Sequence, residues 1–201
     1  DAATGSYYNS VAAWALEQPV QWYDKRRLVP FGEFFPVPQA VREWLRLMNL
    51  PYSDFEPGRA DPAPLRAAGE TFAPTICYED AYGSEQLGLA RQSTLLVNVT
   101  NDAWFGDSTA PHQHLDISRM RSLESGRAML RATNDGVTAL IEHDGSLLGS
   151  LPQFQPGVLT GEVQPRTGLT PYVRFGNWPI LAVLWLGLAV IAVSYHRSIR
   201  Q

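Results

Sequence analysis

The stretch FAPTICYEDAYGSEQLGLARQSTLLVNVT, residues 72–100, contains the pattern that decides the fold. Its two ends, Phe72–Cys77 and Thr94–Thr100, are apolar and rich in β-branched residues, which is typical of buried strands. The segment between them, Gly83–Gln92, predicts a helix. Strands and helices also alternate on either side of this stretch, and hairpins follow. We therefore expect an α/β layered domain with a mixed sheet.

Upstream of this stretch the sequence predicts short elements and long loops. Strands are expected at Ser10–Trp14 and Val20–Tyr23, followed by a loop over Asp24–Pro38. Gln39–Asn49 predicts an amphipathic helix. Its apolar positions recur at helical spacing: Val41, Trp44, Leu45 and Met48. Residues 50–70, rich in Pro, Gly, Asp and Ala, predict a long loop.

Downstream, a second helix is expected over Pro111–Ala132, with proline at its start. Its apolar positions at helical spacing are Ile117, Met120, Leu123 and Leu130. Asp144-Gly145 lies between two apolar runs, Val137–Glu142 and Ser146–Ser150, and predicts a β-hairpin. Gly157–Val163 is expected to form a last strand.

Composition excludes several classes of protein. The 201 residues are 45% hydrophobic and 11% aromatic, enough to bury a core, so a disordered chain is excluded. A net charge of −4 without basic runs argues against a nucleic-acid partner. The single cysteine excludes an intrachain disulfide framework and a Cys-rich zinc module. The sequence opens in a polar segment without an initiator methionine, so we expect it to be part of a longer protein.

Residues 178–195, WPILAVLWLGLAVIAVSY, contain no charged side chain. A helix of this length spans about 27 Å at about 1.5 Å per residue, close to the hydrocarbon thickness of a bilayer. Trp178 and Tyr195 stand at its two ends, where aromatic rings favour the membrane interface. We expect a transmembrane helix at 178–195, preceded by one domain over 1–177 and followed by a short tail, 196–201. The alternative is a buried core helix of a soluble protein. Arginines on both sides leave the orientation open on charge alone.

Two segments carry residues suited to covalent chemistry. Cys77 stands at the end of an apolar strand just before a helix, where the helix N-terminus favours a thiolate. The alternative for a lone cysteine is a small buried hydrophobic residue. Lys25 precedes a Gly/Pro-shaped apolar stretch that ends in Glu33. A lysine near a thiol can lower the pKa of the thiol and bind a developing oxyanion, and a nearby carboxylate would keep that lysine charged.

Four motifs in this order resemble the nitrilase (carbon–nitrogen hydrolase) superfamily, and within it the apolipoprotein N-acyltransferase family of Gram-negative bacteria. They are YDKRRLVPFGEFFP (23–36), TICYED (75–80), NVTNDAWFGDSTAPHQH (98–114) and RAMLRATNDG (127–136). The resemblance covers nearly all of residues 1–195. It implies a nitrilase-like α-β-β-α sandwich, of which residues 1–177 form the C-terminal part, with the N-terminal part absent and a C-terminal transmembrane helix.

The resemblance also implies roles for individual residues. Cys77 matches the nucleophile, Lys25 the catalytic lysine and Glu33 the carboxylate that supports the lysine. Tyr78 and Glu79 match the residues beside the nucleophile, and Glu79 is expected to be catalytic with the other three. Tyr78 is expected to bind substrate, as are Asn101 and Trp104 in the pocket-lining loop. Phe34, Phe35 and the apolar stripe containing Trp44 would form a lipid-facing arm, or the stripe would pack on the domain core. The general-base glutamate of the family lies some tens of residues N-terminal to the lysine, and Glu17 is too close to be that residue.

The reaction implied by the resemblance is an acyl transfer through a thioester on Cys77. The donor is a membrane phospholipid, and the acceptor is the α-amine of the N-terminal diacylglyceryl-cysteine of an apolipoprotein. The reaction needs no cofactor and no metal. We expect a monomer in the bacterial inner membrane with its catalytic domain in the periplasm.

Three alternatives remain at this point. One is a membrane-tethered amidase that hydrolyses small C–N substrates, although Asp80-Ala81-Tyr82 departs from the Arg-containing motif usual there. A second is a metal site on His112 and His114 with Asp116, for which i, i+2 spacing on a helix is poor geometry. The third is a non-catalytic binding module.

Overall fold

The computed structural model describes residues 6–15, 19–38, 41, 44, 47 and 55–199. Their main feature is a six-stranded sheet in the order β3-β4-β5-β6-β7-β8. Its strands are β3 (Leu65–Ala67), β4 (Glu70–Ile76), β5 (Leu95–Asn101), β6 (Met129–Asn134), β7 (Ala139–Ile141) and β8 (Leu147–Ser150). The three central strands β4, β5 and β6 run parallel, and the other pairs are antiparallel. The expected mixed sheet is confirmed.

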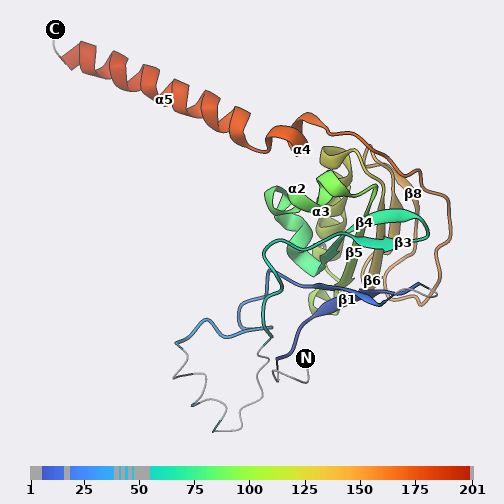
Figure 1. The fold of residues 1–201 in the computed structure, drawn as a ribbon. Helices are drawn as coiled ribbons and strands as arrows, with labels where there is room; N and C mark the ends of the chain where they lie inside the picture. The colour runs from blue at the N-terminus through green and yellow to red at the C-terminus, as the bar shows by residue number, and fades with distance from the viewer. Residues whose placement is uncertain are drawn as a thin grey trace.

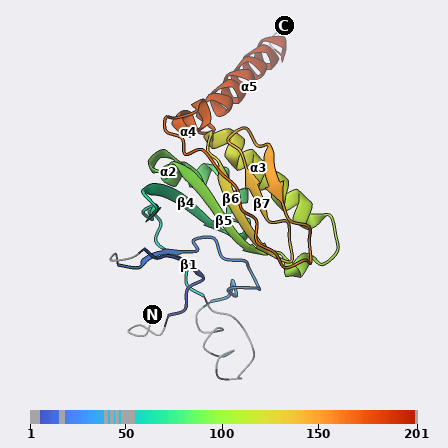
Figure 2. The same cartoon turned by 90° about the vertical axis from the view of Figure 1, so that its right-hand side faces the viewer.

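Helices α2 (Gly83–Gln92) and α3 (Ala110–Ser125) pack together on one face of this sheet (Figures 1 and 2). Because α2 crosses from β4 to β5 and α3 from β5 to β6, both helices follow the parallel connections that such a sheet requires. Between them and the strands lie Leu89, Leu96, Leu115 and Met129, all nearly inaccessible to solvent.

The first two strands form a separate antiparallel pair, β1 (Ser10–Ala13) and β2 (Gln21–Asp24). This pair contacts β3, and β1 also contacts β4, so the segment that follows β2 is brought to the carboxyl end of β4. Two short 3-10 helices, η1 (Cys77–Ala81) and η2 (Ala103–Phe105), follow β4 and β5 directly. The loops that carry the predicted site residues therefore meet at one edge of the sheet.

The predicted elements of residues 72–100 are confirmed, and α2 has the predicted bounds. The hairpin around Asp144-Gly145 is also confirmed, as β7 and β8. The short strand β3 lies in the segment predicted as loop, because its three residues gain their pairing from β4. Of the helix predicted at 39–49, Val41, Trp44 and Leu47 are described and helical, whereas Leu45 and Met48 lie outside the described residues.

The prediction of one helix over Pro111–Ala132 is wrong at its end. α3 stops at Ser125 because Gly126 adopts φ +64°, the left-handed conformation that caps helices. Leu130 belongs to β6, and Met120 is 47% exposed. The buried face of α3 is mainly polar, and its members are Pro111, His114, Leu115, Ser118, Ser122 and Ser125.

The strand predicted at Gly157–Val163 is not observed. Residues 151–170 have no regular secondary structure and run past the β7–β8 hairpin (Figure 1). Leu159 packs against Gly149 of β8, so the segment meets the hairpin through side chains and does not extend the sheet. A short helix that was not predicted, α4 (Pro171–Phe175), follows, and the Thr170 side chain caps its N-terminus.

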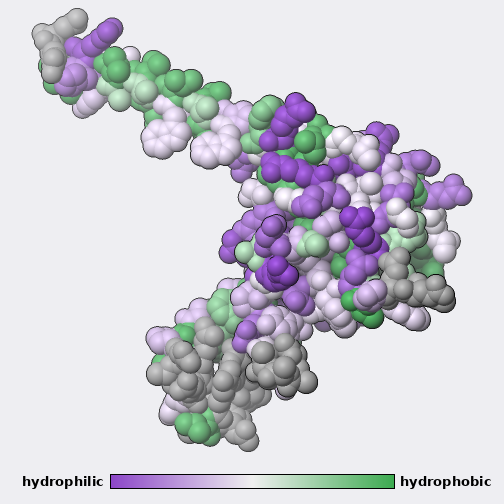
Figure 3. Space-filling view, in the orientation of Figure 1, coloured by the Kyte–Doolittle hydropathy of each residue, from purple (hydrophilic) through white to green (hydrophobic). Residues whose placement is uncertain are grey.

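The last helix, α5 (Trp178–Ile199), projects away from the domain (Figure 1). It buries none of its residues within the described part of the chain, which contradicts the alternative of a core helix. Apolar side chains cover its length in Figure 3. By length and composition α5 is able to cross a membrane, and it continues four residues beyond the predicted end at Tyr195.

Candidate active site

Cys77 occupies a sharp turn between β4 and η1. Its backbone has φ +56°, a conformation that non-glycine residues adopt at an energetic cost of about 1–3 kcal/mol. The Asn98 side-chain amide on β5 donates a hydrogen bond to the Cys77 carbonyl oxygen over 3.1 Å. The thiol residue is half-buried at the rim of the apolar core, so it is accessible and not simply a core side chain.

Lys25, directly after β2, is only 1% exposed. Its Nζ lies 2.8 Å from Oε2 of Glu33, an ion pair within a local turn. Glu33 in turn accepts hydrogen bonds from the Asn9 side-chain amide and from the backbone N–H of Val29, each over 2.8 Å. A buried ammonium needs such a partner, since an unpaired charge would be too costly. Glu33 therefore fixes both the charge and the position of Lys25.

Tyr78 links the lysine to the cysteine turn. Lys25 Nζ lies 5.4 Å from the centre of the Tyr78 ring, a cation–π contact. The Tyr78 hydroxyl donates to the Leu28 carbonyl over 2.9 Å, and burial raises the pKa of Tyr78 to about 12, so it remains protonated. The structure thus brings Lys25 against the residue that follows Cys77, although the two segments are about fifty positions apart in sequence.

Glu79 is fully buried and accepts four hydrogen bonds. Oε1 receives the backbone N–H groups of Arg26 and Arg27 at 2.7 and 3.1 Å. Oε2 receives the Tyr23 hydroxyl and the backbone N–H of Ile76 at 2.9 and 2.8 Å. Burial and the Glu79 charge raise the pKa of Tyr23, so its hydroxyl keeps the proton it donates. Glu79 therefore joins the loop after β2 to the end of β4.

The remaining predicted pocket residues lie around the same edge. Asn101 ends β5 and Trp104 lies in η2 just after it, and β5 runs parallel to β4, so both residues share the carboxyl edge with the cysteine turn. Trp104 is 86% exposed. Phe34 and Phe35 are half-buried in the loop after the lysine, and Trp44 is 55% exposed.

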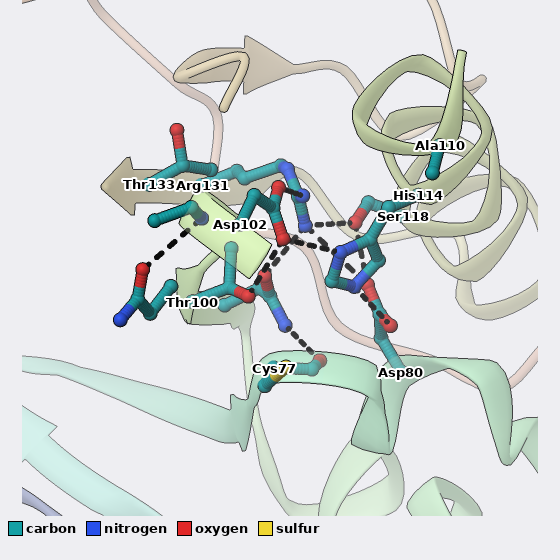
Figure 4. A network of polar contacts seen from close by, with 12 residues as sticks. Cys77, Asp80, Thr100, Asp102, Ala110, His114, Ser118, Arg131 and Thr133 are labelled. Carbon is teal, nitrogen blue, oxygen red and sulfur yellow. Dashed lines mark hydrogen bonds and ion pairs between the residues drawn. The ribbon is translucent and has the colours of Figure 1, made fainter. Parts of the chain in front are cut away.

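A buried polar network lies next to the Cys77 turn and was not predicted from the sequence (Figure 4). His114 on α3 places Nδ1 2.9 Å from Asp102 Oδ1 and Nε2 3.1 Å from Asp80 Oδ1. Arg131 on β6 donates to Asp102 Oδ2 over 3.0 Å and to the Ser118 hydroxyl over 2.8 Å. Ser118 donates to Asp80 Oδ2. The recurrence of His114 and serines every three or four residues along α3 is the signal that could have indicated this polar face.

The two histidines considered as metal ligands, His112 and His114, differ in burial. His112 is exposed on α3, whereas His114 is buried among its carboxylate partners. Burial alone would lower the pKa of His114, but its hydrogen bonds to Asp102 and Asp80 outweigh burial and raise the pKa to about 9. Among the residues that the structure describes, no group of three or more His, Cys, Asp or Glu is arranged to hold a metal ion.

Proteins of known family are similar in sequence to this chain. The chain is 49% identical over 194 residues to the apolipoprotein N-acyltransferase of Azotobacter vinelandii, covering 96% of this chain and 37% of that protein. It is 45% identical over 196 residues to the protein of the same name from Pseudomonas syringae pv. tomato, covering 96% and 38%. The chain thus spans 37–38% of the length of these curated relatives.

Solved structures show the same fold. A carbon–nitrogen hydrolase from Helicobacter pylori matches with a TM-score of 0.56 at 14% identity, covering 76% of this chain and 55% of that chain. The glutamine-dependent NAD+ synthetase of Acinetobacter baumannii matches with a TM-score of 0.57 at 16% identity, covering 77% and 28%. The model of the carbon–nitrogen hydrolase family matches residues 2–172 and so includes every residue described above for the site. The chain belongs to the carbon–nitrogen hydrolase family.

Proposed function

We propose that this chain is the nucleophile-bearing part of an apolipoprotein N-acyltransferase, which moves an acyl chain from a phospholipid to the amino terminus of a lipoprotein. The observation that carries the proposal is Cys77 on a strained turn beside the buried Lys25–Glu33 pair. The names and the 45–49% identity of the relatives support lipid substrates over small amides.

In the first half of the reaction, the Cys77 sulfur attacks the ester carbonyl carbon of the phospholipid. The Lys25 ammonium stabilises the oxyanion of the tetrahedral intermediate, and lysophospholipid leaves with the proton that the thiol gave up. In the second half, the α-amine of a diacylglyceryl-cysteine attacks the thioester carbonyl. An amide forms, the amine loses a proton, and the thiol is regenerated. Because both transfers use one covalent intermediate, the kinetics are ping-pong.

Glu33 and Glu79 are suited to positioning and not to proton transfer. Both oxygens of Glu33 accept from Lys25, and each has a further donor. Both oxygens of Glu79 are likewise occupied by two donors each. The family resemblance assigns the general base to a further glutamate, N-terminal to Lys25.

The membrane helix gives the reaction its location. Both substrates are lipid-anchored, so the site has to be held at a bilayer surface, and α5 is long and apolar enough to do this. We propose that the domain faces the periplasm, that it acts as a monomer, and that Phe34, Phe35 and Trp44 contact lipid near the site.

The proposal is tested by intact-protein mass spectrometry of the full-length protein after incubation with phosphatidylethanolamine vesicles. A hydroxylamine-labile adduct of acyl mass is expected on the unmutated protein and is absent from Cys77→Ala. Adding a diacylglyceryl-cysteine peptide should discharge the adduct and yield the acylated peptide. Discharge by water alone would favour the amidase, and an unmodified protein under all conditions would favour a binding module.

A further inference from the structure

The polar network described above joins four separate segments at the cysteine turn. Asp80 belongs to η1, the helix that begins with Cys77, and His114 to α3. Asp102 follows β5, and Arg131 lies on β6. Asp80, Asp102 and Arg131 are at most 2% exposed, and His114 is 6% exposed. Groups this deeply buried keep their charges only if those charges are balanced within the network.

The geometry sets the protonation of the histidine. Each ring nitrogen of His114 faces a carboxylate oxygen, Asp102 on one side and Asp80 on the other. A neutral imidazole has one N–H donor, whereas an imidazolium has two. Only the imidazolium can donate to both carboxylates. With Arg131 as the second cation, the network then contains two positive and two negative charges.

The network reaches Cys77 along two routes (Figure 4). Asp80 anchors η1 three residues after the cysteine, through His114 and Ser118. On the other side, Arg131 donates to Asn98 Oδ1 over 2.6 Å, and the Asn98 amide donates to the Cys77 carbonyl. The strained φ of Cys77 is therefore held from its own carbonyl and from the helix that follows it.

We propose that His114, as an imidazolium clamped between Asp80 and Asp102, is a positioning residue that holds the Cys77 turn in its reactive conformation. This inference rests on the proposed function, because it takes Cys77 as the nucleophile. It assigns to His114 a dependence on protonation that a simple packing role does not have. When His114 loses a proton, one ring nitrogen presents a lone pair to Asp80 or to Asp102, and the link through His114 between η1 and the loop after β5 is broken.

The test compares His114→Gln with His112→Gln in the full-length protein. Both variants make the same substitution on α3, but His112 is exposed and lies outside the network. The first readout is the rate at which iodoacetamide alkylates Cys77, followed by peptide mass spectrometry, with circular dichroism to verify folding. The second is the rate of thioester formation on phosphatidylethanolamine vesicles. We expect His114→Gln to slow both at least tenfold and His112→Gln to leave both unchanged.

The pH dependence separates positioning from packing. In the unmutated protein the alkylation rate constant per Cys77 thiolate should fall as pH rises through about 9, the pKa of His114. The thiolate fraction at each pH is measured by ultraviolet absorbance against Cys77→Ala, because only the thiolate is alkylated. Asp80, Asp102 and Arg131 are the charged groups that face the ring. The fall should persist in Lys25→Arg, whose guanidinium does not titrate there, and should be absent from His114→Gln.

The outcomes are decisive in each case. A folded His114→Gln protein that is alkylated within twofold of the unmutated rate would overturn the proposal. If His114→Gln does not fold, the unmutated profile decides, and a rate per thiolate that stays level or rises from pH 8 to 10.5 overturns the proposal. An unmutated protein that forms no thioester would refute the proposed function. Because alkylation of Cys77 needs no phospholipid, the comparison of alkylation rates would still test the positioning role of His114.

Discussion

Replacing Glu79 by glutamine is expected to release the loop that positions Lys25 while leaving the volume of the side chain unchanged. The carboxylate accepts four hydrogen bonds, two on each oxygen, from the loop after β2, from Tyr23 and from the end of β4. A glutamine amide retains one oxygen and replaces the other with an NH2 group. Whichever way the amide is oriented, two donors then face a donor.

The size of the effect follows from those two lost bonds. A hydrogen bond to a charged acceptor contributes about 1.5–3 kcal/mol, so the local cost is about 3–6 kcal/mol. At about 1.4 kcal/mol per factor of ten, local opening becomes about 10²- to 10⁴-fold more frequent. Global unfolding is not required, because such domains are stable by about 5–15 kcal/mol.

Hydrogen–deuterium exchange with peptide mass spectrometry measures this opening in the full-length protein. The relevant amides are those of Arg26 and Arg27 on one side and of Ile76 on the other. At least one of the two peptides that contain them should exchange about 100-fold faster in Glu79→Gln. Glu85→Gln is the matched control, because Glu85 pairs at the surface with the Arg27 side chain and accepts none of these amides.

The reasoning would be refuted if both peptides in Glu79→Gln exchanged within threefold of the unmutated rate. If acyl transfer were lost at the same time, Glu79 would act on the reacting groups themselves. If acyl transfer were retained, the carboxylate would be dispensable to both loop and reaction.

Four further predictions follow from the site and from the apolar helix α5. Lys25→Met should reduce thioester formation at least 100-fold, because the oxyanion loses its cation, and the acyl adduct seen by mass spectrometry measures this. Gly136→Ala should lower the free energy of unfolding by about 1–3 kcal/mol, because the added Cβ would lie 2.4 Å from Asp102 Oδ2. The pKa of His114 is raised in the fold to about 9 from 6.5, so its contribution to stability is complete below pH 6.5 and is lost as pH rises through 9. The urea midpoint should therefore decline between pH 7 and 10, and less so in His114→Gln. Leu186→Arg, at the middle of α5, should oppose membrane insertion of this helix by about 2.5–3.5 kcal/mol and lower the fraction of α5 that inserts in a translocon reporter assay.

Local pattern was sufficient for the central elements of the fold. The β-branched runs at 72–77 and 94–100 and the Asp144-Gly145 turn encode their conformation within a few residues, and the structure confirms them. The error at α3 has a local cause as well. Leu130 falls at helical spacing, but Gly126 ends the helix before it, so the glycine signal should have outweighed the periodicity.

The site depended on contacts that no single segment encodes. The sequence marked Cys77, Lys25 and Glu33 as chemically suited residues, but spacing alone could not show that Lys25 lies against Tyr78, the residue after Cys77. This contact requires β2 to pack beside the sheet and Glu79 to join the two loops.

The His114 network was hidden for a related reason. Its four charged members come from four elements, and each alone resembles a surface residue or, for His114, a poor metal ligand. Burial converts them into a unit, because a low-dielectric interior makes every unpaired charge costly and so forces each one onto a partner. A serine-and-histidine face on α3 has no apolar periodicity to detect, yet this face packs against the segments that hold the candidate nucleophile. The polar residues of α3, which are the least typical of a core helix, are therefore the ones that connect this helix to the candidate site at Cys77.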